Sequence, residues 1–351
     1  MQFINRKMDR YDKMGGDFDM HAGGFSELIG NEQIKEHFLH AISSGKVSHC
    51  YVISGEDGLG KMTAAKAFAQ TLECQAEPAN RPCGVCHSCT QFLSGNHPDV
   101  IFPGHEKPTV IGVDDVRTQI IGDIQIKPYC SPYKIYIVDE AQKLSVQAQN
   151  ALLKTIEEPP AYAVIIFLTN NAGVFLPTIL SRCVMLSLKP VKNQLIVEYL
   201  MKNCKIPEYH AQLCAAFAQG RPGRAVKLAA SPDFEEIKSD IIKLLKNIHN
   251  MELTDLAASI KDINNYDISV DDCLDIMTLW FRDVLLFKVS RDPNSLVFTD
   301  EVADIRRAAG KSSYEGLELI MEAFDKAKTR LHANVNYDMT MELLLLTIKE
   351  N

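Results

Sequence analysis

The sequence predicts an α/β module with a parallel sheet, followed by a second half made only of helices. Three observations carry this prediction. A glycine-rich pattern typical of phosphate-binding loops occupies residues 55–61. Apolar strand-like runs alternate with helical patterns over residues 25–188, which is typical of a parallel sheet covered by helices on both faces. After Pro190 the strand-like runs stop, and amphipathic helical patterns follow.

The composition is that of a globular protein of two or three domains. The chain has 351 residues, of which 46% are hydrophobic and 23% charged. Its net charge of −8 disfavours free-standing nucleic-acid binding. No apolar run reaches the roughly 20 residues that cross a bilayer, and no basic segment followed by an apolar one opens the chain. We therefore expect a cytoplasmic protein that does not contact membranes.

Four parts follow one another along the chain. Residues 1–24 show no periodicity and predict a flexible leader. Residues 25–189 form the α/β domain, in which a helix within residues 25–44 precedes the first strand. Residues 190–230 predict a small helical part, and residues 231–351 predict a larger helical domain.

The phosphate-loop pattern lies between a short apolar strand, residues 50–53, and a helix that begins at Lys61. Glycines let backbone N–H groups converge on phosphate oxygens, the helix N-terminus adds a partial positive charge, and the lysine reaches the β- and γ-phosphates. The candidate nucleotide contacts in this loop are Gly55, Gly58, Gly60 and Lys61.

One position of the loop departs from the pattern. The residue after the lysine should be Ser or Thr, whose hydroxyl binds Mg²⁺, but this chain has Met62. A thioether is a poor ligand for a hard cation. Thr63 is the nearest hydroxyl and a candidate contact, but one residue turns a helical side chain by about 100°. We therefore expect the loop to keep its shape better than it supports Mg²⁺-dependent hydrolysis.

Four of the ten cysteines lie close together in a segment rich in turn-forming residues. Short Cys-x2-Cys steps let thiolates converge on a tetrahedral metal ion, and four sulfurs complete a closed structural zinc site. His87 lies inside the cluster, but four cysteines already satisfy the ion. Unrelated buried thiols or disulfides are the alternative, and a reducing compartment disfavours disulfides. The predicted zinc module, residues 74–89, uses Cys74, Cys83, Cys86 and Cys89. For most of the other six cysteines, small buried apolar side chains are the expected role.

The remaining strands place polar side chains at their ends. A strand within residues 99–102 and a helix within residues 111–125 precede a buried strand at residues 134–138. That strand ends at Asp139 and Glu140, and in nucleotide-binding sheets the Asp at this place holds Mg²⁺ while the Glu orients a water.

Two further segments complete the α/β pattern. A helix over residues 145–158 stops before Pro159. The next strand, residues 164–170, ends in Thr169 and Asn170, either of which could contact a γ-phosphate or act only as a strand cap. Arg182 then precedes a last strand at residues 184–188.

Amphipathic stripes mark the helical second half. One stripe lies within residues 273–288 and another within residues 341–348. Such stripes most often pack into the core of their own chain, so a partner surface is the second interpretation.

In this order, the motifs resemble the clamp-loader branch of the AAA+ ATPases over nearly the whole chain after Gly24, and most closely the delta-prime type of bacterial DNA polymerase III subunit. The resemblance rests on the loop GEDGLGKMT, the four-cysteine insertion, the segments IYIVDEAQKLSVQAQNALLKTIEEPP and VIIFLTN, the triplet SRC and the helical tail. It implies an AAA+ α/β module with an inserted zinc module, an all-α lid over residues 190–230 and an all-α collar that assembles into an asymmetric pentamer.

The resemblance also implies roles for single residues. Lys61 matches the phosphate-loop lysine, and Asp139 with Glu140 matches the pair that binds Mg²⁺ and orients water. Thr169 or Asn170 matches a sensor of the γ-phosphate. Arg182 matches the arginine finger, which acts on ATP bound by the neighbouring subunit; a surface ion-pair former is the alternative.

Two departures from the family pattern limit nucleotide chemistry in this chain. Met62 removes the Mg²⁺-binding hydroxyl, and in GRPGRA either Arg221 or Arg224 could face the nucleotide, neither where an active motor has it. We expect structural Zn²⁺ as the cofactor, with ATP and Mg²⁺ bound weakly or not at all.

The leading interpretation is a stator subunit that donates Arg182 to the ATP site of a neighbour. Its expected partners are the gamma/tau motor and delta subunits, the sliding clamp and, through the complex, primed DNA. An active gamma/tau-type motor subunit is the alternative. A zinc-dependent nucleic-acid-binding module is a third class, which the acidic balance and the lack of a basic or aromatic stripe near the cysteines argue against.

Overall fold

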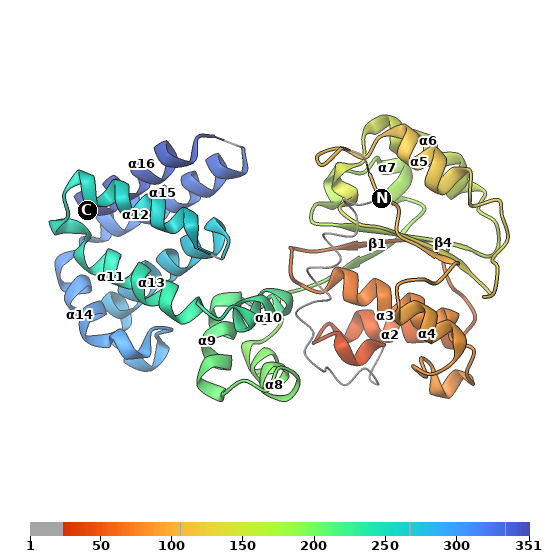
Figure 1. Cartoon of the computed structure of the whole chain (residues 1–351), viewed down its shortest axis with the longest axis horizontal. Helices are drawn as coiled ribbons and strands as arrows, with labels where there is room; N and C mark the ends of the chain where they lie inside the picture. The colour runs from red at the N-terminus through yellow and green to blue at the C-terminus, as the bar shows by residue number, and fades with distance from the viewer. Residues whose placement is uncertain (1–23, 106, 267, 334) are drawn as a thin grey trace. The chain divides into compact units, whose positions relative to one another are not determined.

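The computed structural model describes residues 24–105, 107–266, 268–333 and 335–351 (Figure 1). These residues divide into two compact units. The first comprises residues 24–205 and 219–224, and the second comprises residues 206–218 and 225–351. The predicted leader, residues 1–24, lies outside the described residues except for Gly24.

The first unit is built on a five-stranded sheet in which every paired neighbour is parallel. The strand order across the sheet is β2-β3-β4-β1-β5. The strands are β1 (Cys50–Ser54), β2 (Val100–Ile101), β3 (Lys134–Val138), β4 (Ala163–Thr169) and β5 (Val184–Ser187). The α/β class and the parallel sheet predicted from the sequence are confirmed.

Helices cover both faces of this sheet, as predicted (Figure 1). One face carries α2 (Glu32–Ser43), α3 (Lys61–Glu73) and α4 (His87–Leu93). The other carries α5 (Val113–Val116), α6 (Val146–Glu157) and α7 (Pro177–Leu180). Because strand side chains alternate, Tyr51 packs into the core of the first face while Val52 packs into that of the second.

Local sequence explains where the longest helix of the second face begins and ends. The Ser145 side chain caps α6 by accepting a hydrogen bond from the N–H of Ala148. At the other end, α6 stops at Glu157, before Pro159, because proline disfavours helical backbone in the residue that precedes it.

Short helical turns connect these elements. The predicted helix at residues 111–125 divides into α5 and one π-helical segment, η3 (Arg117–Ile121). The 3₁₀ turns are η1 (Phe25–Glu27), η2 (Pro78–Asn80), η4 (Ala141–Lys143), η5 (Ala172–Val174), η6 (Ile248–Asn250), η7 (Pro293–Ser295) and η8 (Thr299–Glu301).

Helix α8 (Asn193–Asn203) belongs to the first unit, and α10 (Pro222–Ala230) begins in the first and ends in the second. Among the described residues of the second unit, all regular secondary structure is helical. Its helices are α9 (Glu208–Ala218), α11 (Phe234–Asn247), α12 (Leu253–Asn265), α13 (Val270–Ser290), α14 (Val302–Lys311), α15 (Tyr314–His332) and α16 (Tyr337–Glu350).

The long helix α13 is the centre of the second unit. It packs against α11, α14 and α15, and α16 packs against α12 and α15. The stripe residues Leu274, Met277 and Val284 are fully buried, and so is Met341 on α16. The stripes are therefore core, as the first interpretation held. Within the described residues, no helix combines the length and apolarity that a bilayer span requires.

Candidate functional site

The predicted nucleotide-site residues gather at one edge of the sheet, because the carboxyl ends of parallel strands meet there. The phosphate loop follows β1, Asp139 follows β3 and Asn170 follows β4. Strands β1 and β4 pair so that Ser54 lies opposite Thr169, and the Gly55 N–H donates to the Thr169 carbonyl at 3.0 Å.

Two glycines give the loop a backbone conformation that other residues rarely adopt. Gly58 and Gly60 have φ angles of +84° and +97°, which residues with a side chain rarely adopt. Helix α3 begins directly after Gly60, so its first N–H groups point toward the loop.

The loop lysine is hydrogen-bonded to groups of its own loop. The Lys61 Nζ donates to the carbonyls of Gly55 and Glu56, at 2.6 and 3.1 Å, and to the Asp57 carboxylate at 3.0 Å. An incoming phosphate therefore has to displace a carboxylate that the loop itself supplies. The sequence showed Asp57, but the contact depends on the fold of the loop.

Met62 contributes to the core and not to the nucleotide edge. Its side chain is partly buried and packs against the apolar cluster beneath α3. The Mg²⁺-binding hydroxyl is thus replaced by an apolar packing group, and Thr63 follows it on the half-buried first turn of the helix.

Asp139 and Glu140 lie where the sequence predicted, at the end of β3. Asp139 is exposed and accepts the N–H of Glu140 at 2.9 Å. Glu140 has a φ of +48°, and its carboxylate lies 2.7 Å from the Lys143 ammonium and 3.7 Å from His105 Nε2. The water-orienting candidate is therefore held by basic groups of its own chain.

The two sensor candidates on β4 differ in their surroundings. Thr169 is fully buried, and its hydroxyl exchanges hydrogen bonds with the backbone of Asn171. Asn170 is exposed. Of the two, Asn170 is the side chain that a ligand at this edge can reach.

The segment carrying Arg221 and Arg224 lies against the phosphate loop. The Gly223 N–H donates to the Gly58 carbonyl at 2.8 Å, and a Cβ added to Gly58 would lie 3.2 Å from the backbone nitrogen of Arg224. The Arg221 guanidinium lies 3.9 Å from the Glu56 carboxylate. This close backbone approach was not evident in the sequence, because it joins residues more than 160 positions apart.

Arg182 lies two residues after the end of α7, where three acceptors hold its side chain. Its Nη1 donates to the Thr178 carbonyl at 2.8 Å and to the Ser181 hydroxyl at 3.2 Å. Its Nη2 lies 3.0 Å from the carboxylate of Glu157, the last residue of α6. The sequence singled out Arg182 but not Glu157.

Sequence reasoning also missed a disulfide beside this arginine. Cys183 is bonded to Cys50, the first residue of β1. The parallel register pairs Tyr51 with Val184, which puts the two cysteines side by side. Two of the six scattered cysteines therefore form a bond, and the signal that could have revealed it is the register of two neighbouring strands.

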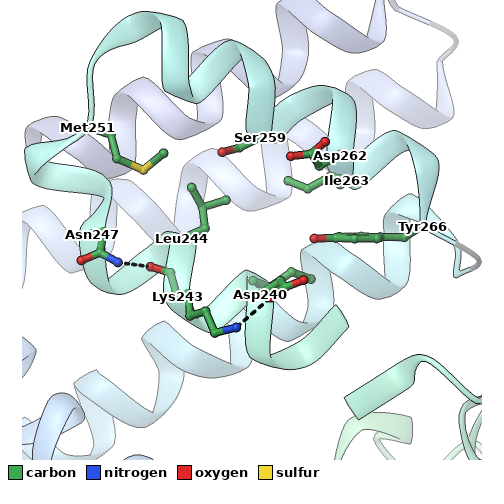
Figure 2. A pocket seen from close by; sticks show the side chains of 10 residues that line it. Asp240, Lys243, Leu244, Asn247, Met251, Ser259, Asp262, Ile263 and Tyr266 are labelled. Atoms are coloured by element: carbon green, nitrogen blue, oxygen red, sulfur yellow. Dashed lines mark hydrogen bonds and ion pairs between the residues drawn. The ribbon is translucent and has the colours of Figure 1, made fainter. Parts of the chain in front are cut away.

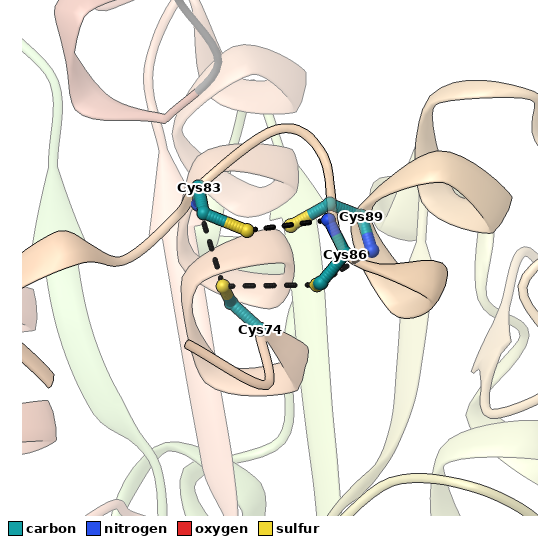
Figure 3. Close-up of side chains that lie close together, drawn as sticks. All are labelled: Cys74, Cys83, Cys86 and Cys89. Carbon is teal, nitrogen blue, oxygen red and sulfur yellow. Dashed lines mark hydrogen bonds between the residues drawn. The ribbon is translucent and has the colours of Figure 1, made fainter. Parts of the chain in front are cut away.

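The four-cysteine cluster forms as predicted (Figure 3). The four sulfurs lie within 4.8 Å of one another, and those of Cys74 and Cys86 are 4.0 Å apart. A tetrahedral zinc with Zn–S bonds of about 2.3 Å sets its sulfurs roughly 3.8 Å apart, so these donors fit the ion.

Backbone donors around the cluster favour thiolates. The Cys74 sulfur accepts the N–H groups of Ala76 and Cys83, and the sulfurs of Cys83 and Cys86 accept those of Cys86 and Cys89. The N–H groups of Val85 and Cys86 lower the pKa of Cys83 to about 6. Burial raises the pKa of Cys74 and Cys89 in the absence of an ion, and a metal ion reverses that preference.

A separate hollow lies on the second unit between α11 and α12 (Figure 2). It has a volume of about 320 Å³ and an apolar floor that includes Leu244 and Ile263. Asp240 pairs with Lys243 at its rim, and burial raises the pKa of Tyr266 to about 12. No predicted site residue lines it.

Two family models match the chain. Residues 30–192 match the model described as DNA polymerase III, delta subunit, and residues 232–350 match the model described as DNA polymerase III, delta subunit, C terminal. Together they cover well over half of the sequence.

Curated relatives of this chain include two further DNA polymerase III subunits. The DNA polymerase III subunit tau of Bacillus subtilis is 27% identical over 343 residues, which cover 90% of this chain but only 60% of tau. The subunit delta' of the same organism is 28% identical over 319 residues, which cover 89% of this chain and 94% of delta'. A DNA polymerase III gamma subunit-related protein of Thermotoga maritima has a solved structure with a TM-score of 0.43 and 21% identity, over 90% of this chain and 98% of that one.

Proposed function

Because the chain belongs to the clamp-loader family of DNA polymerase III subunits, with an AAA+ fold, we propose that it is the delta-prime stator of that assembly. In this proposal it joins the gamma/tau motor and delta subunits through its helical second unit. It donates Arg182 to ATP bound by a neighbour, and the complex loads the sliding clamp onto primed DNA in the cytoplasm.

The observation that carries the proposal is the contrast between the two charged groups. Lys61 is bonded within its own loop to two carbonyls and a carboxylate, and Met62 stands where a Mg²⁺-binding hydroxyl is needed. Arg182 is also paired with a carboxylate, that of Glu157, but its side chain is 38% exposed, whereas that of Lys61 is 10% exposed. A guanidinium is permanently charged and offers planar donors to phosphoryl oxygens. The chain is therefore better suited to supply Arg182 to ATP bound by a neighbour than to hydrolyse ATP at its own site.

Residues at the nucleotide edge fit a weakened site. Gly55, Gly58 and Gly60 retain the cradle, and Asp139 and Asn170 retain polar groups at the strand ends. If ATP and Mg²⁺ bind at this edge, ATP supplies the phosphoryl group for hydrolysis and Mg²⁺ supplies the cation that neutralises its phosphates. In this chain Asp57 and Lys143 already neutralise Lys61 and Glu140, respectively. Thr63 and Arg224 complete the candidate contacts.

The test is ATP hydrolysis, stimulated by DNA and clamp, in a complex reconstituted with motor and delta subunits. Arginine fingers are worth about 10³ to 10⁵ in rate at the site they serve, so Arg182→Ala should silence one neighbouring site. Lys61→Ala in this chain should leave the rate unchanged. A loss with Lys61→Ala as large as that from the same change in a motor subunit would instead identify a motor of the gamma/tau type.

A further inference from the structure

We propose that Glu157 is a positioning residue that orients Arg182 for its action on the neighbouring subunit. This inference rests on the proposed role of Arg182 in trans. It adds to that role by identifying α6, through Glu157, as a second element that holds the arginine.

The geometry fixes both ends of the guanidinium fork. Nη1 is held by the Thr178 carbonyl and the Ser181 hydroxyl, which come from α7 and its cap. Nη2 is held at 3.0 Å by Glu157, which comes from α6. Because a guanidinium is planar, attachment at both terminal nitrogens sets the direction of the whole group. The Nε–H and the second Nη2 N–H have no acceptor among these three groups, so they can face a phosphate.

Helix stability does not explain a carboxylate at this place. Glu157 ends α6, where the partial negative charge of the helix disfavours an acidic side chain. The ion pair itself lies between side chains that are 38% and 48% exposed, and such pairs add little to folding stability. The contact between Glu157 and Arg182 therefore adds little to stability, and its main effect is to orient the Arg182 guanidinium.

The chain offers a matched control. Glu158 is the next residue, carries the same charge and is exposed, whereas the Arg182 ion pair is made by Glu157. Replacing either glutamate changes the net charge equally. A difference between the two variants therefore measures the contact with Arg182 and not the local charge.

The experiment compares Glu157→Ala, Glu157→Gln, Glu158→Ala and Arg182→Ala in the reconstituted complex, with kcat and KM for ATP measured separately. Small misplacements of a catalytic group cost large factors in rate, so Glu157→Ala should remove about half or more of the Arg182-dependent kcat with KM unchanged. Glu157→Gln keeps an oxygen acceptor and should retain most of it. Glu158→Ala should match the wild type, and all variants should melt at the same temperature.

The outcomes separate the two proposals. If Arg182→Ala leaves the rate unchanged, both the trans role and this inference fail. If Arg182→Ala slows hydrolysis while Glu157→Ala behaves like Glu158→Ala, only the positioning role fails. A faster rate with Glu157→Ala would show that the glutamate restrains the arginine, which also overturns it. The double variant Arg182→Ala with Glu157→Ala should be no slower than Arg182→Ala alone, and an additive loss would contradict action through Arg182.

Discussion

Asp99 shows how a single buried carboxylate can organise a loop of the first unit. It is 2% exposed, and its oxygens accept the N–H groups of Tyr129, Cys130 and Ser131 at 2.6, 2.8 and 3.1 Å. Burial alone would raise its pKa, but the donors of Cys130 and Tyr129 outweigh burial and lower the pKa below its usual 3.8. The ionised carboxylate thus holds the loop that precedes β3.

We predict that Asp99→Asn lowers the free energy of unfolding by about 1–3 kcal/mol at neutral pH, because an amide nitrogen would face backbone donors. A carboxyl with a lowered folded-state pKa stabilises the fold above its unfolded-state pKa, and this contribution is lost as the pH falls through the folded-state pKa. The difference between wild type and variant should therefore shrink in acid. Urea unfolding at neutral and acidic pH measures it.

Asp114→Asn is the control for this prediction, because Asp114 is exposed and pairs with Arg117 at the surface. It should unfold like the wild type at both pH values. Equal stability of the Asp99 variant and the wild type at neutral pH would show that the three N–H contacts contribute nothing.

At the residue scale, the sequence predicted the identities of the site residues better than their partners. Lys61 and Arg182 stand out because their motifs are local. Asp57 and Glu157, which hold them, are ordinary acidic residues whose role depends on loop shape and on the packing of α6 beside α7. No spacing rule connects Glu157 with Arg182, so only the folded arrangement reveals the pair.

The zinc module is the element whose stability should depend on an ion. We predict that the purified chain holds one zinc per molecule and that Cys86→Ser loses it. Chelation should lower the melting temperature, because a structural zinc site contributes directly to folding. Metal analysis and melting curves with and without chelator measure both effects.

Cys204→Ser, outside the cluster, is the matched control and should keep its zinc. In an assembled complex, chelation should leave most of the ATP hydrolysis intact, because the module is structural. A chelator that leaves the melting curve unchanged would argue against a bound ion in this module.

Helices and strands were predicted well where the apolar periodicity and a helix-breaking residue, such as proline, indicate the same boundary. The strand at residues 134–138 and the helix before Pro159 formed as expected, within one residue at each end. Residues 111–125 were less predictable, since the apolar spacing of an α-helix and a π-helical turn is similar over one turn. The four-part division of the chain stays a prediction, because contacts such as Gly223 with Gly58 group segments that are distant in sequence.

At the scale of the whole molecule, charge leads to a prediction about DNA. The chain has a net charge of −8, so phosphate contacts must come from partners or from a local patch. We predict that the chain alone does not bind primed DNA at physiological salt, as measured by fluorescence anisotropy of a labelled primer–template. The reconstituted complex is the positive control. Micromolar binding by the chain alone, with a steep salt dependence, would favour a nucleic-acid-binding module instead.

The Cys50–Cys183 bond closes a covalent ring within the first unit, with a sequence separation of 133. The ring includes the phosphate loop, the cysteine cluster and Arg182. A protease that cuts once inside it produces two fragments that remain joined by sulfur. The nicked chain would migrate as one species on a non-reducing gel and separate after addition of a thiol. The appearance of two fragments on a gel therefore requires both cleavage of the chain and reduction of the Cys50–Cys183 bond.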